Sequence, residues 1–111
     1  MFLATTALAK LPEADANRLV DAIYKIEGGS KTKFYYGIKS IPIKGDTEQE
    51  RLVYARKICF NTVQRTHDRW LKAKKPGFYI DFLANRYCPP SADKQGNLNW
   101  KKNARKFWGE Q

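Results

Sequence analysis

The first regular pattern along the chain is a helical stripe of apolar residues that begins after Pro12. Apolar side chains recur every three or four positions, at Leu19, Val20, Ala22, Ile23 and Ile26. Pro12 followed by acidic residues is typical of a helix start, because the helix dipole stabilises negative charge there. Gly28 and Gly29 are typical of a helix end, because glycine readily adopts the left-handed conformation. We therefore predict a helix from about Pro12 to Glu27 with one buried face.

The segment 30–45 has a different pattern. Its aromatic and β-branched residues favour strands, but glycine and proline interrupt them at Gly37, Pro42 and Gly45. We expect a loop or a rudimentary β-hairpin here, not a proper sheet. This short irregular segment should line a cleft.

Three further helices are predicted in the rest of the chain. Asp46 or Thr47 should cap a long helix that runs to about Ala73, and a third helix should span about Phe78–Tyr87. A polar loop over 91–96 then leads to a final helix near Leu98–Trp108. The apolar stripes of these helices include Leu52, Ala55, Cys59, Val63, Thr66, Trp70, Trp100, Ala104 and Phe107. The predicted fold class is mainly α.

Length and charge limit the number of domains and the class of partner that the sequence allows. The chain has 111 residues, 42% of them hydrophobic, which suits a single domain over 10–111 with a real core. Residues 1–9 are apolar and end in Ala7-Leu8-Ala9, which is either the remnant of a signal peptide or an ordinary N-terminus. The net charge of +10 favours polyanionic partners. The two basic runs, 72–75 and 101–106, are either binding surfaces or solvated helix faces.

The two cysteines, Cys59 and Cys88, lie far apart in the sequence. In an exported protein they favour one disulfide, and in a reducing compartment two buried thiols; the sequence leaves both open. The single histidine, His67, does not complete a zinc-ligand pattern with them. We expect neither a metal site nor another cofactor.

Glu27 is the candidate for chemistry. It lies four positions after Ile23 and so prolongs the apolar stripe of the first predicted helix. A carboxyl group on that face is partly removed from water, which raises its pKa and lets it act as a general acid near neutral pH. The adjacent glycines leave room for a bulky substrate. An exposed glutamate at a frayed helix end is the alternative interpretation.

The motif Ile26-Glu27-Gly28-Gly29, followed by Tyr36-Gly37-Ile38-Lys39-Ser40, resembles the catalytic signature of the lysozyme-like superfamily. Within that superfamily, the chain resembles small phage and bacterial proteins that are related to lytic transglycosylases. The resemblance extends from Asp15 to Asn103. It also rests on the segments 59–62, 69–70, 82–83, 86–89 and 99–100.

The resemblance implies a small lysozyme-like domain that cleaves the MurNAc-GlcNAc bond of peptidoglycan, with Glu27 as the catalytic residue. Carried over residue by residue, it implies a substrate-binding cleft wall formed by Tyr36, Gly37, Ile38 and Ser40. Ser40 stands where many transglycosylases have glutamine, which puts that polar contact in doubt. Tyr87 would correspond to the tyrosine that supports the catalytic site.

The reaction type depends on a second carboxylate. Phage lysozymes with this signature have an aspartate shortly after the glutamate, whereas this chain has Lys31, Lys33 and Tyr35 in that region. We therefore expect a single-glutamate, transglycosylase-type reaction that yields a 1,6-anhydro sugar. Asp46 or Asp21 could still approach the cleft in the folded protein and favour hydrolysis instead.

Two rival functions remain on the sequence alone. One is a non-catalytic wall-binding or virion structural protein on a lysozyme-like scaffold, and the other is a basic nucleic-acid-binding module. The chain lacks a recognisable nucleic-acid-binding motif, so we expect no stable nucleic-acid partner. We expect a monomer without a membrane span whose partner is peptidoglycan. It should be periplasmic or secreted, or associated with a virion.

Overall fold

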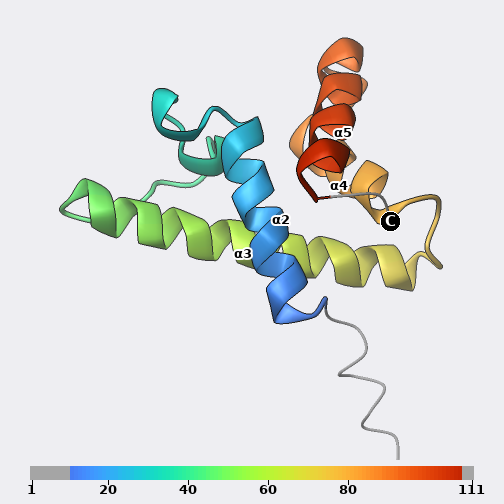
Figure 1. Cartoon of the computed structure of the whole chain (residues 1–111), viewed down its shortest axis with the longest axis horizontal. Helices are drawn as coiled ribbons and strands as arrows, with labels where there is room; N and C mark the ends of the chain where they lie inside the picture. The colour runs from blue at the N-terminus through green and yellow to red at the C-terminus, as the bar shows by residue number, and fades with distance from the viewer. Residues whose placement is uncertain (1–10, 109–111) are drawn as a thin grey trace, which may run out of the picture.

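The computed structural model describes residues 11–108, with side chains up to Lys106, and is mainly α-helical as predicted. Figure 1 shows the long helix α3 as the base of the molecule, with α2 crossing it. The segment that follows α2 lies on one side of the C-terminal end of α2, and α4 and α5 lie on the other. The C-terminal end of α2 is therefore flanked by segments from both halves of the chain.

Helix α2 spans Glu13–Ile26. Pro12 precedes it, and Glu13 and Asp15 place negative charge in its first turn. Its buried residues are Ala16, Leu19, Val20, Ala22 and Ile23. The predicted stripe is thus the face that packs on α3 and α5.

Helix α3 spans Glu48–Lys72 and begins with a capping box. The side chain of Thr47 accepts a hydrogen bond from the Glu50 N–H, and the Glu50 carboxylate bonds back to the Thr47 backbone. Its buried stripe is Ala55, Cys59, Val63 and Thr66. Gln64 also bonds both backbone groups of Leu11, which ties the start of α2 to α3.

Helices α4 (Tyr79–Tyr87) and α5 (Lys94–Trp108) form an antiparallel pair in which α4 packs on α3 and α5 packs on α2. Helix α5 begins earlier than predicted, because Asp93 accepts a hydrogen bond from the Gly96 N–H and caps the first turn. The buried side chain of Asn97 donates to the Asn85 side chain and to the Cys88 carbonyl. These contacts fix the start of α5 against the end of α4.

The expected β-hairpin is absent from the described residues. The segment after α2 instead forms two 3-10 turns, η1 (Gly29–Lys31) and η2 (Tyr35–Gly37), followed by irregular chain up to α3. Tyr36 and Gly37 have φ values of 55° and 70°, which are incompatible with a pleated strand. Tertiary contacts of Tyr36 therefore override the strand preference of its neighbours.

One core joins all four described helices and η2. Trp100 and Ala104 belong to it as predicted, Trp70 packs at its edge, and Phe107, also predicted there, lies outside the described side chains. No helix in the described part of the chain is long and apolar enough to cross a bilayer.

Candidate active site

Glu27 directly follows the last residue of α2 and continues its buried face. Its backbone N–H donates to the Ile23 carbonyl over 2.9 Å, so the helical path extends to Glu27 before Gly28 turns the chain at φ 106°. The side chain is only partly exposed. Burial raises the pKa of Glu27 above its ordinary value of 4.5, and a hydrogen bond from Trp100 and the charge of Lys39 partly offset this rise.

Trp100 on α5 holds one oxygen of this carboxyl group. Its indole Nε1 donates a hydrogen bond to Glu27 Oε2 over 3.0 Å, and only 5% of the residue is exposed. The contact joins residues 73 positions apart in the chain. Helix α5 therefore fixes the direction in which the Glu27 carboxyl points.

Gly37 lies against the other side of the same carboxyl group. A Cβ atom at position 37 would lie 2.6 Å from both Cδ and Oε1 of Glu27, which is closer than real Cβ contacts. The φ of Gly37 is also positive, at 70°. Only glycine meets both conditions, so the close approach of η2 to Glu27 depends on it.

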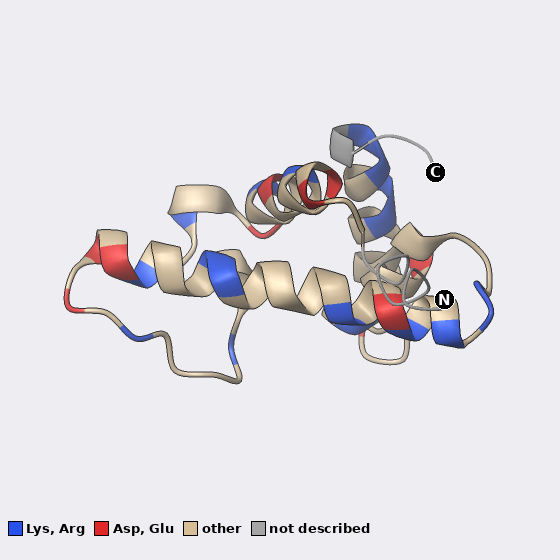
Figure 2. Cartoon of the chain, turned by 90° about the horizontal axis from the view of Figure 1, so that it is seen from below, with Lys and Arg blue, Asp and Glu red and all other residues tan. Residues whose placement is uncertain are grey.

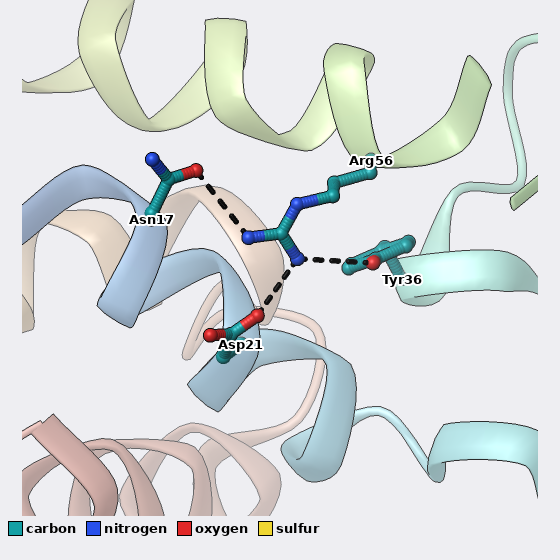
Figure 3. Close-up of polar contacts among 4 residues, drawn as sticks. All are labelled: Asn17, Asp21, Tyr36 and Arg56. Atoms are coloured by element: carbon teal, nitrogen blue, oxygen red, sulfur yellow. Dashed lines mark hydrogen bonds and ion pairs between the residues drawn. The ribbon is translucent and has the colours of Figure 1, made fainter. Parts of the chain in front are cut away.

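Tyr36 holds this turn through contacts with Tyr24 and Arg56. It adopts a left-handed conformation that costs a residue other than glycine roughly 1–2 kcal/mol. Its buried ring packs on Tyr24, with centroids 5.1 Å apart, and Arg56 Nη1 lies 3.5 Å from its hydroxyl oxygen. Arg56 also donates to Asp21 and Asn17 on α2, as Figure 3 shows. Arg56 thus joins α2, α3 and η2 and holds the turn that carries Gly37.

A pocket of about 100 Å³ adjoins Gly37. Residues 37–41, Ile58 and Thr62 of α3, and Arg86 and Tyr87 of α4 line it. The Thr62 hydroxyl donates to the Ile58 carbonyl over 3.0 Å, which leaves its oxygen free to accept from a ligand. The pocket therefore combines apolar side chains, hydroxyls and two cations.

The structure brings four of the five predicted cleft residues, Gly37, Ile38, Ser40 and Tyr87, to this pocket. Tyr36, the fifth, is 6% exposed and does not belong to the pocket lining. Its contacts with Arg56 and Tyr24 give it a supporting position rather than one at the surface of the cleft.

Tyr87 connects the pocket with the support of Glu27. Its ring stacks on Trp100, with centroids 5.3 Å apart and planes at 14°. Its hydroxyl lies 3.4 Å from Cys59 Sγ on α3, inside the protein. Burial raises the pKa of the Tyr87 hydroxyl and raises that of the Cys59 thiol to about 12. Both groups therefore stay neutral near pH 7, and the Tyr87 ring packs on Trp100.

The disulfide considered for Cys59 and Cys88 is absent, because both are free thiols. Tyr87, not Cys88, faces Cys59 across the α3–α4 contact. Successive residues at a helix end point in different directions, and Cys88 Sγ accordingly lies near the Asp93 carbonyl. Of the two thiols, Cys59 is buried and Cys88 is partly exposed, so the interpretation as two buried thiols holds for Cys59 only.

The two aspartates considered as partners of Glu27 have other positions. Asp21 pairs with Arg56 over 2.7 Å, and Asp46 lies in the cap of α3, where its N–H donates to Glu50. Glu27 lies six positions after Asp21, which corresponds to a rise of about 9 Å along the helix and a different face. In the described part of the chain, the pocket lining contains neither Asp nor Glu.

Sequence reasoning missed three features of the site. It assigned Trp100 to the core without its bond to Glu27, and it did not single out Lys39 or Arg86. Lys39 lies between the predicted residues Ile38 and Ser40, and Arg86 directly precedes the predicted Tyr87. This adjacency to predicted cleft residues is the sequence signal that could have indicated both cations. The donor role of Trp100 has no local signal, because it depends on how α5 packs against α2.

The described residues contain no cluster of three or more His, Cys, Asp or Glu side chains placed to hold a metal ion. Comparison of the chain with protein-family models, with curated proteins and with solved structures found no match.

Proposed function

We propose that this protein cleaves the MurNAc-GlcNAc bond of peptidoglycan with Glu27 as its single catalytic carboxyl group. The observation that carries the proposal is the environment of Glu27. Its carboxyl is partly buried, has a raised pKa, and lies between the Trp100 indole and Gly37 beside a pocket. A desolvated glutamic acid of this kind can donate a proton near neutral pH.

In the first step, protonated Glu27 donates its proton to the glycosidic oxygen, and the bond from that oxygen to C1 breaks. The carbonyl oxygen of the sugar's own 2-acetamido group stabilises the positive charge at C1. Isoleucines 38, 41 and 58 and the hydroxyls of Ser40 and Thr62 give the pocket the mixed surface that an acetamido group requires.

In the second step, the Glu27 carboxylate accepts the proton of the 6-hydroxyl group while the oxygen of that hydroxyl attacks C1. The product is a 1,6-anhydro sugar, Glu27 is again protonated, and no water is consumed. The absence of a second carboxylate from the described lining favours this lytic transglycosylase-type reaction over hydrolysis, which needs a base or nucleophile near the acid.

The distribution of charge gives less support to a nucleic-acid-binding module. Lys and Arg residues occur along α3, on α5 and in the loops at both ends of α3, rather than in a single stripe (Figure 2). A non-catalytic wall-binding or virion protein with the same fold is the other alternative, and it predicts binding without products.

The first test is release of soluble fragments from dye-labelled peptidoglycan. We expect release by the wild type and a loss of at least about 100-fold in Glu27→Gln, because that variant has no proton to donate. Glu13→Gln is the matched control, since Glu13 is an exposed glutamate on the same helix. Equal release by wild type and Glu27→Gln would exclude Glu27 as the catalytic group, and binding without release by the wild type would favour the non-catalytic alternative.

A further inference from the structure

The pocket beside Glu27 contains two cations and, within the described residues, no carboxylate in its lining. Lys39 belongs to the loop after η2, and Arg86 belongs to the last turn of α4. They reach the same pocket from elements that are far apart in the sequence. The described lining therefore has a net positive charge, which attracts an anionic group.

The ammonium group of Lys39 has a defined position. Its Nζ lies 5.3 Å from the centroid of the Phe34 ring, a cation–π contact that restrains the side chain. Its charge also acts on Glu27, where it lowers the pKa, so Lys39 lies near the candidate catalytic carboxyl as well as in the pocket.

Arg86 supplies the second positive group. A guanidinium offers several N–H donors in a planar arrangement that matches the two oxygens of a carboxylate. The Ser40 hydroxyl lies in the same lining and can donate to a carboxylate, whereas the Thr62 hydroxyl donates to the Ile58 carbonyl. The pocket, of about 100 Å³, has room for a small substituent such as a carboxylate.

We propose that Lys39 and Arg86 bind a carboxylate carried by a muramyl residue of the glycan strand, and so distinguish peptidoglycan from an uncharged N-acetylglucosamine polymer. This inference rests on the proposed function, because it assigns the substrate class of the same site. The carboxylate comes either from the lactyl group of a residue without a stem peptide or from the stem peptide itself. Both sources present the same group to the same two cations.

The test is a binding measurement by NMR titration of the wild-type protein with three small ligands that it cannot cleave. N-acetylmuramic acid carries the lactyl carboxylate, N-acetylmuramyl-L-alanyl-D-glutamate carries stem-peptide carboxylates, and N-acetylglucosamine carries none. We expect at least one muramyl ligand to bind tighter than N-acetylglucosamine by about threefold for each cation that it contacts. The ligand with the larger preference identifies the source of the carboxylate.

The variant Lys39→Gln/Arg86→Gln should bind all three ligands with similar affinity. The control Lys44→Gln/Lys57→Gln removes the same charge from exposed positions outside this pocket and should keep the preference. Because both cations are near solvent, the preference should also weaken between low salt and about 1 M NaCl. Equal binding of all three ligands by the wild type, or an unchanged preference in Lys39→Gln/Arg86→Gln, would overturn the proposal.

The failure of this inference can be distinguished from failure of the proposed function. A carboxylate preference that depends on Lys39 and Arg86, together with no cleavage of peptidoglycan, would support the carboxylate-binding site and overturn the proposed catalytic function. Cleavage that depends on Glu27, together with no carboxylate preference, would support the proposed function and overturn the proposed carboxylate-binding site.

Discussion

The indole Nε1 of Trp100 donates a hydrogen bond to Glu27 Oε2 over 3.0 Å, and this contact joins the end of α2 to the middle of α5. The bond favours the ionised carboxylate, whereas burial favours the protonated acid, and burial is the larger effect on the Glu27 pKa. The carboxyl group is thereby fixed in direction while remaining easier to protonate than an exposed glutamate. A group that donates a proton and later accepts one needs both properties.

Trp100→Phe should raise the pKa of Glu27 further, because it removes a hydrogen bond to the charged form and leaves burial in place. Measurement of the Glu27 carboxyl carbon by NMR across pH reports this directly. In the proposed reaction, the alkaline limb of the pH dependence of kcat/KM should move to higher pH. The free energy of unfolding should fall by roughly 2 kcal/mol.

Trp70→Phe is the matched control for this prediction. Trp70 is also partly buried, but its Nε1 has no hydrogen-bond partner among residues 11–108, and its ring packs on His67 and Tyr79 instead of contacting Glu27. It should leave the Glu27 pKa unchanged. A Glu27 pKa that stays constant or falls in Trp100→Phe would contradict the assigned role of Trp100.

Gly37→Ala should displace the Glu27 carboxyl and abolish most of the cleavage activity. The new Cβ would lie 2.6 Å from Glu27 Cδ, and the left-handed conformation costs alanine roughly 1–2 kcal/mol. Gly77→Ala separates the two effects, because Gly77 has the same φ of 70° but nothing within 4 Å of an added Cβ. Gly37→Ala should lose more stability in urea unfolding than Gly77→Ala, because it adds the clash with Glu27 to the same conformational cost, and only Gly37→Ala should lose activity. Equal activity of the two would show that the Gly37 contact is unimportant.

Glu27→Gln should make the protein more stable at pH 7. Because the Glu27 pKa is raised in the folded state, the folded protein holds this proton more tightly than the unfolded chain does. The free energy of unfolding therefore falls as pH rises from about 4.5 through the folded pKa, and glutamine removes that loss. Thermal unfolding of both proteins should show a higher Tm for the variant at pH 7 and converging values below pH 4. A lower Tm for the variant at pH 7 would indicate that the carboxylate is stabilising.

Cys59 should resist alkylation in the native protein. Its pKa of about 12 leaves little thiolate at pH 8, and its side chain is buried. Labelling with iodoacetamide followed by mass spectrometry should be on the order of 10³-fold slower at Cys59 than in the unfolded chain. Cys88 is partly exposed and should react first. An intact mass lower by two hydrogens, with no labelling before reduction, would instead reveal a disulfide.

The sequence predicts the helices well because each has a local signal. Glu27 is the candidate acid because it continues the stripe of Leu19 and Ile23, is followed by glycines, and lies in a motif that resembles the lysozyme-like signature. The segment after α2 was predicted less well, because the conformation of Tyr36 depends on Arg56 from another helix. Contacts between helices likewise decide the bond from Trp100. Local patterns therefore identify the candidate acid, but not the residues that hold it.

The most direct test of the central claim is mass spectrometry of purified peptidoglycan after digestion with the wild type and with Glu27→Gln. We expect muropeptides that end in 1,6-anhydro sugars from the wild type and none from Glu27→Gln. Reducing-end products would contradict the single-glutamate reaction and point to a second carboxylate. No products from either protein, with walls of several compositions, would contradict the assignment of this protein as a peptidoglycan-cleaving enzyme.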